Sequence, residues 1–183
     1  MKNVLIISFI LSALLASCVS YDELINQGKE EYDNGNAEEA QLSFEKALKK
    51  DSTRPDAYYG LGFLLAEKCR AKQTGCEYGV NYFTQVIRID SNYRHAFYNR
   101  ANCFMELGQY KEALHDLNTP ASINKQDADY LGNRSICYLN VGDTLNALTS
   151  YKEAVKLNFG KRSEYMDLIF QEYSSRNEDR LKK

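Results

Sequence analysis

Proline and histidine are scarce in this sequence, and tryptophan is absent. Only two prolines occur in 183 residues, so few positions break a helix and the composition suits a mostly helical chain. The two histidines, His95 and His115, have no companion Cys or carboxylate at metal-ligand spacing. No phosphate-binding loop, nucleophile elbow or paired-carboxylate motif is found either. We therefore expect no enzyme activity, no cofactor, no metal site and no small-molecule substrate.

The sequence also lacks an excess of positive charge. Lys and Arg number 23 against 25 Asp and Glu, which gives a net charge of −2. A nucleic-acid-binding protein needs a basic surface to neutralise phosphates, so no nucleic-acid partner is expected. Hydrophobic residues make up 44% of the chain and charged residues 26%, which is typical of a folded body.

No hydrophobic run is long enough to span a bilayer. The run from Val4 to Leu15 has about a dozen residues, where a helical span needs about 20. It follows Lys2 and leads into Leu15-Ala16-Ser17-Cys18, which resembles the lipobox of bacterial lipoproteins. The resemblance implies a signal peptide over residues 1–17, cleavage before Cys18 and acylation of that cysteine. The alternative is an ordinary secreted protein in which a cysteine happens to follow the cleavage site.

The same resemblance implies that the protein is located in the bacterial cell envelope. Residues 18–20 would form the lipidated cysteine and a short linker, and acyl chains would hold the protein at a membrane. Val19 follows the cysteine, whereas an Asp there tends to retain enterobacterial lipoproteins at the inner membrane. The outer membrane is therefore the favoured location.

Two stretches of the remaining chain repeat one another. Asn99 to Gly108 reads NRANCFMELG, and Asn133 to Gly142 reads NRSICYLNVG. A stretch that recurs at a fixed interval, here from position 99 to position 133, predicts a chain built of similar supersecondary units that stack on one another. Upstream, two amphipathic helical patterns flank a turn at Asn34-Gly35-Asn36, so each unit is expected to be a helix–turn–helix.

These features resemble the tetratricopeptide repeat family, whose repeat is a helix–turn–helix of about 34 residues. Small residues recur in the first helix at Gly28, Gly62, Ala101 and Ser135. Large residues recur in the second helix at Phe44, Phe83, Leu117 and Tyr151. The resemblance implies an all-α, right-handed superhelical solenoid of about four repeats plus a C-terminal capping helix. The expected boundaries are 21–54, 55–93, 94–127 and 128–161 for the repeats, and 162–183 for the capping helix and its basic tail.

Two irregularities interrupt the repeat pattern. The interval from Gly62 to Ala101 is five positions longer than the interval from Gly28 to Gly62, so the second repeat contains an insertion of that length. We expect the insertion, within residues 67–76, to lengthen the turn of that repeat. Pro120 falls in the second helix of the third repeat and should end it early, with residues 121–127 forming a loop.

Four cysteines remain after Cys18. Cys69 and Cys76 flank the insertion in a chain expected in an oxidising envelope, and a disulfide between them is the favoured reading over two unrelated thiols. Cys103 and Cys137 occupy equivalent places on adjacent helices. Packed helix axes lie about 8–10 Å apart, which is too far for a bridge, so we expect two buried thiols.

The family resemblance implies that the first helices line a groove for an extended peptide or a partner helix. The slots at the centre of that groove correspond to apolar, aromatic and a few polar residues: Ile25, Lys29, Tyr32, Tyr59, Phe63, Tyr98, Asn102, Met105, Ile136 and Leu139. The flanking slots correspond to an acidic rim: Asp22, Asp33, Asp56, Glu67, Glu106 and Asp129. An apolar floor with an acidic rim favours a basic amphipathic partner segment. The alternative is that some of these residues, Phe63 and Ile136 above all, only pack neighbouring repeats together.

The expected function is therefore that of a membrane-anchored interaction scaffold. One hypothesis places it in the assembly of an outer-membrane or surface complex. The alternative is an adaptor that recruits or regulates envelope enzymes such as cell-wall hydrolases. An integral β-barrel partner would favour the first hypothesis, and a soluble hydrolase partner the second.

Overall fold

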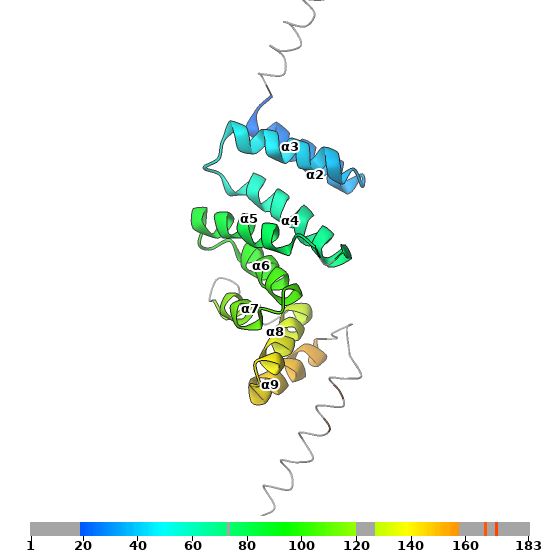
Figure 1. Ribbon diagram of the computed structural model, residues 1–183, viewed down its shortest axis with the longest axis vertical. Helices are drawn as coiled ribbons and strands as arrows, with labels where there is room; N and C mark the ends of the chain where they lie inside the picture. The colour runs from blue at the N-terminus through cyan, green and yellow to red at the C-terminus, as the bar shows by residue number, and fades with distance from the viewer. Residues whose placement is uncertain (1–18, 73, 120–126, 158–166, 168–170, 172–183) are drawn as a thin grey trace, which may run out of the picture. The chain divides into compact units, whose positions relative to one another are not determined.

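In the part of the chain that the structure describes, all regular secondary structure is helical. The computed structural model describes residues 19–72, 74–119 and 127–157, together with Asp167 and Gln171 (Figure 1). The expected signal peptide at residues 1–17 and the acylation site Cys18 lie outside the described residues, and so does the expected capping helix apart from Asp167 and Gln171. Across the described residues, no helix is both long enough and apolar enough to cross a membrane.

The chain divides into two compact units at residue 91. The N-terminal unit contains the helices α2 (Tyr21–Asp33), α3 (Ala37–Lys50), α4 (Pro55–Lys72) and α5 (Cys76–Ile89). The C-terminal unit contains the helices α6 (Arg94–Glu106), α7 (Tyr110–Leu117), α8 (Ala128–Asn140) and α9 (Thr144–Lys156). Together they form four helical hairpins, as the repeat pattern predicts.

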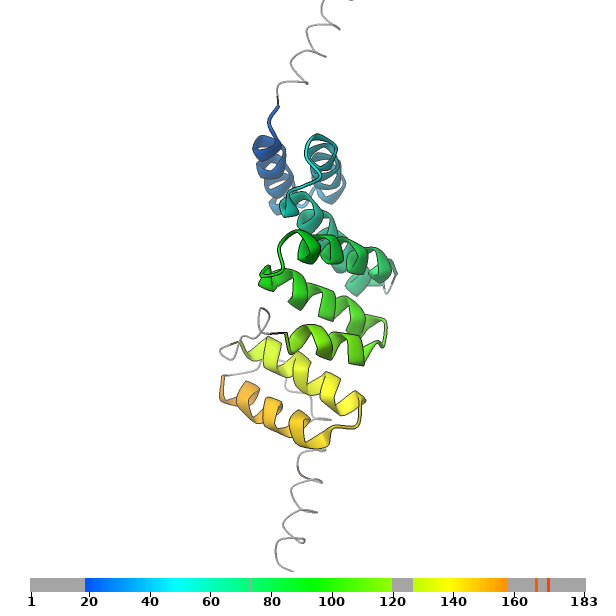
Figure 2. The same ribbon diagram turned by 90° about the vertical axis from the view of Figure 1, so that its left-hand side faces the viewer.

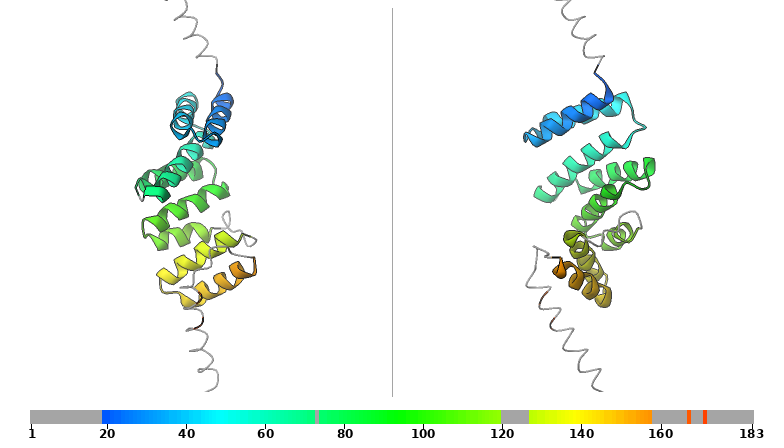
Figure 3. Two further views of the ribbon diagram at one scale, coloured as in Figure 1. Left: turned by 90° about the vertical axis from the view of Figure 1, so that its right-hand side faces the viewer. Right: turned by 180° about the vertical axis from the view of Figure 1, so that it is seen from behind.

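Each hairpin packs its two helices side by side. In Figure 2 the pair α8 and α9 runs antiparallel, in yellow and orange. Within the N-terminal unit, α4 packs beside the α2–α3 pair, which is visible from behind in Figure 3. Each unit therefore buries its apolar face both inside a hairpin and between consecutive hairpins.

Local sequence signals set where these helices begin and end. Ser20 and Glu23 form a reciprocal capping box at the start of α2. At its end, Gly35 adopts φ of +83°, a left-handed conformation that favours glycine, and donates its N–H to the carbonyl of Tyr32. Gly108 and Gly142 end α6 and α8 in the same conformation, which explains the glycine in each predicted turn.

The large-into-small packing implied by the family resemblance is present. The ring of Phe44 fits between two glycines, because a Cβ atom added at Gly28 or Gly60 would lie 2.6 or 2.8 Å from it. Phe83 packs on Gly62 in the same manner, with a Cβ distance of 3.0 Å. Without these glycines the helices could not approach so closely.

The insertion in the second repeat was predicted to lengthen a turn, and this prediction is wrong. The α4 helix has 18 residues, whereas α2, α6 and α8 have 13 each. The inserted length is therefore helical, and α5 begins four positions after α4 ends, as in the other hairpins. The insertion extends α4 by about one and a half turns.

The early end of the third repeat's second helix is confirmed. The α7 helix has eight residues and ends at Leu117, three positions before Pro120. Residues 121–126 of the expected loop lie outside the described residues. Asp127 is the extended N-cap of α8, where its carboxylate accepts the N–H of Tyr130.

Candidate protein-binding surface

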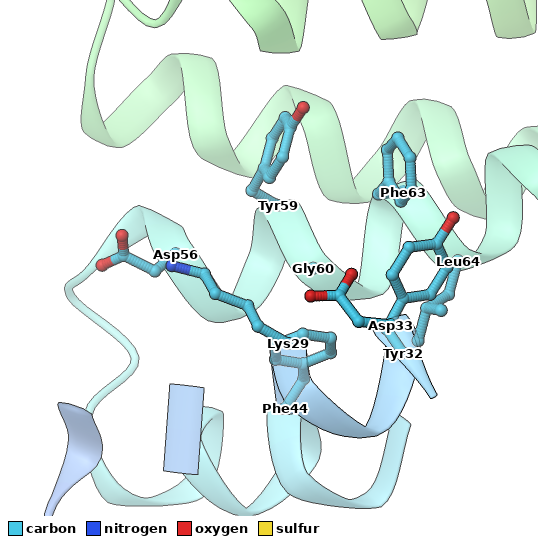
Figure 4. A pocket seen from close by; sticks show the side chains of 9 residues that line it. All are labelled: Lys29, Tyr32, Asp33, Phe44, Asp56, Tyr59, Gly60, Phe63 and Leu64. Atoms are coloured by element: carbon cyan, nitrogen blue, oxygen red, sulfur yellow. The ribbon is translucent and has the colours of Figure 1, made fainter. Parts of the chain in front are cut away.

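A pocket of about 290 Å³ opens on the N-terminal unit between α2 and α4 (Figure 4). The helix α3 contributes Phe44 to its lining. The remaining lining comes from α2 and α4: Lys29, Tyr32, Asp33, Asp56, Tyr59, Gly60, Phe63 and Leu64. Four predicted groove residues, Lys29, Tyr32, Tyr59 and Phe63, are therefore brought together here. Two predicted rim residues, Asp33 and Asp56, join them.

Aromatic rings form the apolar part of the pocket. Phe63 meets Tyr32 edge-on, with 5.5 Å between the ring centroids, and stacks on Tyr59 at 6.2 Å. All three side chains are half-buried. Ring pairs in these arrangements hold one another in place, so each presents part of a fixed apolar surface to the pocket. Phe63 thus both packs between helices and lines the pocket.

One carboxylate of the predicted rim, that of Glu67, accepts a hydrogen bond from a neighbouring tyrosine. The hydroxyl of Tyr32 donates a hydrogen bond of 2.7 Å to Glu67. This bond, together with partial burial and the charges of Glu67 and Asp33, raises the pKa of Tyr32 to about 12. The Tyr32 ring is fixed at its hydroxyl as well as by its edge contact with Phe63.

Two other rim carboxylates share Arg54, which was not among the predicted site residues. Arg54 pairs with Asp22 at 2.8 Å and with Asp56 at 3.5 Å, and its guanidinium lies 4.0 Å from the centroid of the Tyr21 ring. The bond to Arg54 lowers the pKa of Asp22. The rim at this end is therefore less negative than the sequence suggested. Two charged side chains one helical turn apart on α2, Lys29 and Asp33, form no ion pair with any residue in the described ranges.

Ile25 was expected in the groove, and this expectation is wrong. It is 5% exposed and belongs to the core of the N-terminal unit, together with Leu24 and Tyr21. The physical reason is that α2 packs on both α3 and α4, so the face bearing Ile25 is covered.

The other predicted groove residues lie in the C-terminal unit. The amide of Asn133 on α8 donates to Asn102 at 2.8 Å and to the Tyr98 hydroxyl at 3.2 Å, which ties α6 to α8. Met105 and Leu139 are half-buried against the core of this unit. Ile136 is also half-buried. The remaining rim residues, Glu106 at the end of α6 and Asp129 at the start of α8, are exposed.

Comparison with known proteins places these hairpins in a family. A profile described as "TPR repeat" matches residues 28–68, and one described as "Tetratricopeptide repeat" matches residues 95–127 and 128–160, together more than half of the chain. The chain belongs to the tetratricopeptide repeat family. Such repeats bind protein or peptide partners, so this chain carries the fold of an interaction scaffold.

Relatives of this tetratricopeptide repeat (TPR) protein include much longer chains. Human tetratricopeptide repeat protein 6 is 26% identical over 155 residues, which cover 83% of this chain and 29% of the human protein. Heat shock protein STI1 of Saccharomyces cerevisiae is 27% identical over 85 residues, which cover 46% of this chain and 14% of the yeast protein. The TPR chain thus spans less than a third of either relative.

Solved structures show the same fold. A crystal structure of MamA has a TM-score of 0.67 at 21% identity and covers 82% of this chain and 85% of MamA. A MamA structure from Desulfovibrio magneticus RS-1 has a TM-score of 0.67 at 14% identity, with 80% of each chain covered. Pseudomonas aeruginosa PilF has a TM-score of 0.65 at 20% identity, with 86% of this chain and 69% of PilF covered.

The arginines of the two repeated Asn-Arg pairs hold α6 on α7 and α8 on α9. Arg100 forms two hydrogen bonds, of 2.6 and 2.7 Å, with Asp116, which is 1% exposed. Arg134, the equivalent residue of the next repeat, donates to Ser150 at 3.2 Å and pairs with Glu153 at 3.7 Å. The contact with Ser150 follows from the repeat register, whereas the pair with Glu153 was not predicted.

The cysteines of the TPR body divide into one bonded pair and two buried thiols. Cys69 and Cys76 form a disulfide with 5.1 Å between their Cα atoms. It links the extension of α4 to the first residue of α5. Cys103 and Cys137 are buried thiols, and burial raises the pKa of the Cys137 thiol to about 12.

His95 and His115 are both exposed. Within the described ranges, no cluster of three or more His, Cys, Asp or Glu side chains is arranged to hold a metal ion.

Proposed function

We propose that this TPR protein is a lipid-anchored scaffold of the bacterial cell envelope that holds a partner segment in the pocket between α2 and α4. Its role would be the assembly of an outer-membrane or surface complex. The observation that carries the proposal is the preformed aromatic pocket in a family that binds protein partners. The proposal assigns no reaction to the chain.

The pocket's chemistry indicates the kind of segment it would accept. Phe44, Tyr59 and Phe63 offer a rigid apolar surface for one large apolar side chain of the partner. Asp33 lies at the pocket without an ion-pair partner in the described ranges, so it can accept a basic side chain on the same segment. Lys29 on the same wall disfavours a uniformly basic ligand. We therefore propose an amphipathic segment with one basic residue placed next to its apolar anchor.

The start of the body supports anchoring close to a membrane. The α2 helix begins at Tyr21, three positions after the proposed acylation site Cys18. The side chain of Lys50 donates to the carbonyl of Val19, which fixes the residue next to Cys18 on the body. A linker of two or three residues reaches about 10 Å at most, so a body anchored at Cys18 would lie against the membrane surface.

Photo-crosslinking in living cells tests the pocket. A photoreactive residue replaces Tyr59, and the matched control replaces Tyr78, which is 64% exposed on α5 and outside the pocket lining. We expect a discrete partner captured from position 59 alone, with capture lost when Phe63→Ala is added. The captured segment should carry an apolar residue beside a basic one.

The outcomes separate the two candidate roles. An integral β-barrel or surface-machinery partner supports assembly, whereas a soluble hydrolase supports the adaptor hypothesis. Equal capture from positions 59 and 78, or capture that survives Phe63→Ala, would show that the pocket is not the binding surface.

A further inference from the structure

A second hollow on the N-terminal unit is lined by lysines and lies beside the proposed anchor. Its volume is about 360 Å³. Six residues from the chain preceding α2, from α2 and from the end of α3 line it: Val19, Leu24, Gln27, Lys46, Lys49 and Lys50. No carboxylate is among them. Val19, which lines the hollow, follows Cys18 directly in the sequence.

The lysines differ in how far they are already engaged. Lys50 donates to the Val19 carbonyl and so helps to build the hollow. Lys46 and Lys49 are exposed and form no ion pair with a residue that the structure describes. The nearby carboxylate of Glu23 accepts a hydrogen bond of 2.6 Å from the backbone N–H of Ser20. The hollow thus offers two uncompensated ammonium groups.

An exposed apolar side chain adjoins these lysines. Leu42 is 54% exposed on α3, one helical turn before Lys46 and two turns before Lys49. An apolar residue flanked by lysines is the composition of a surface that sits in a lipid headgroup region, where the apolar side chain enters the interface and the ammonium groups meet phosphates.

We infer that the hollow lined by Lys46 and Lys49 seats the phosphate-bearing headgroups of anionic lipids in the bilayer that holds Cys18. The inference rests on the proposed lipid anchor. Acylation would hold Cys18 at the lipid surface. Val19 is the next residue, and consecutive Cα atoms lie about 3.8 Å apart, so Val19 would also lie close to the lipid. Because such proximity makes the contact effectively intramolecular, the adjacent bilayer is favoured over an acidic protein arriving from solution. The contact would orient the body on the membrane.

The test uses the acylated protein as the cells produce it, purified in detergent and reconstituted into vesicles. One set of vesicles is phosphatidylcholine alone, and the other contains phosphatidylcholine and phosphatidylglycerol in equal amounts. A fluorophore is placed at Leu42→Cys, and a spin-labelled headgroup lipid quenches it on contact. Labelling is selective because Cys69 and Cys76 are bonded and Cys103 and Cys137 are buried.

We expect stronger quenching in the anionic vesicles, and loss of that difference in Lys46→Gln/Lys49→Gln. Each lysine near an anionic surface shifts the equilibrium by roughly fivefold. The matched control is Lys111→Gln/Lys152→Gln, two exposed lysines of α7 and α9 that carry the same change in net charge. It should leave the quenching unchanged.

Different failures have different signatures. A missing acyl mass on Cys18 would overturn the anchor and this inference together. Acylated protein that is quenched equally in both vesicle types, or a control pair as disruptive as Lys46→Gln/Lys49→Gln, would overturn only the headgroup contact. Binding of a soluble acidic protein at this face, without a lipid effect, would assign the surface to that partner instead.

Discussion

At the scale of single residues, the tightest constraint in the N-terminal unit is the Phe44 ring, which is held between Gly28 and Gly60. An exposed Gly→Ala change inside a helix stabilises by about 1 kcal/mol. Gly60→Ala should have the opposite sign, because its methyl would lie 2.8 Å from a ring that Gly28 blocks on the other side. We expect destabilisation of about 1–3 kcal/mol in urea unfolding.

The matched control for this prediction is Asn26→Ala, which also introduces alanine into a helix but at an exposed position of α2. It should change the free energy of unfolding by no more than about 0.5 kcal/mol. A Gly60→Ala protein as stable as the wild type would mean that the ring can move and that the close approach of α4 to α3 is not fixed by this contact.

The repeat offers an internal control for the Arg100–Asp116 pair. Arg100→Met leaves the Asp116 carboxylate, 1% exposed, without its guanidinium, which should cost about 3–5 kcal/mol. Arg134→Met, at the equivalent position of the next repeat, breaks contacts with Ser150 and with Glu153, whose side chain is 47% exposed, and should cost about 1 kcal/mol or less. Thermal unfolding of both variants checks the difference, and equal losses would contradict it.

The Tyr32–Glu67 bond predicts a titration at high pH. The pKa of Tyr32 is raised to about 12, above the value of about 10 for an unfolded tyrosine. The protonated phenol therefore favours the folded state. Its contribution is fully present below about pH 10 and is lost as the pH rises through 12.

Because the chain has 14 tyrosines, NMR of ring-labelled tyrosine is the suitable measurement, with Tyr32→Phe assigning the signal. Glu67→Gln should return the midpoint of Tyr32 toward 10, since the largest cause of the shift is the bond to Glu67. A Tyr32 signal that titrates together with those of exposed tyrosines would show that this bond does not form in solution.

At the scale of helices, the sequence predicted hairpins better than it predicted helix lengths. The repeat period and the glycine of each turn specify the hairpin, and both can be recognised in the sequence. Whether the insertion lengthens a turn or a helix cannot be recognised in the same way. Residues 67–72 (Glu-Lys-Cys-Arg-Ala-Lys) are strong helix formers apart from Cys69. Ala66 and Cys69, three positions apart, are both buried, so the apolar face continues and α4 extends to Lys72.

The pocket shows a similar division between what the sequence could and could not predict. Tyr59 and Phe63 followed from aligning the repeats, because the family fixes which side of each first helix faces the groove. The role of Arg54 could not be predicted by this alignment. Its partners Asp22 and Asp56 belong to different repeats, and they come together only when α4 packs beside α2. Ile25 was misplaced for a similar reason: its burial depends on how α2 packs against α3 and α4.

The disulfide is the natural probe of the α4 extension. Removing the crosslink between Cys69 and Cys76 should destabilise the N-terminal unit by about 2.5 kcal/mol, the chain-entropy value for an eight-residue loop. We expect Cys69→Ser/Cys76→Ser to show this loss and to speed amide exchange in residues 68–72. Reductant should reproduce the effect in the wild type and leave the double variant unchanged. A wild type insensitive to reductant would contradict the role of the crosslink.

At the scale of the whole molecule, the proposal joins a partner pocket to an anchor that lies just before α2. These two parts should be separable. Cys18→Ser removes the acyl chains, each buried CH₂ of which contributes about 0.8 kcal/mol to membrane binding, but it leaves the α2–α4 pocket unchanged. We expect the variant to move from the membrane fraction to the soluble fraction, while crosslinking from Tyr59 to the purified partner persists. Cys103→Ser, at a buried thiol, is the control and should stay with the membrane.

A high-salt wash of the membranes distinguishes binding through acyl chains from binding through surface lysines. The contact of Lys46 and Lys49 with headgroups is electrostatic, and salt at about 1 M shortens the screening length to about 3 Å, so such a wash should release any Cys18→Ser protein held by lysines alone. The acylated wild type should resist the same wash, because burial of acyl chains does not depend on screening. Retention of Cys18→Ser after the wash would mean that something other than Cys18 holds the protein, and the pocket would then work without the anchor proposed here.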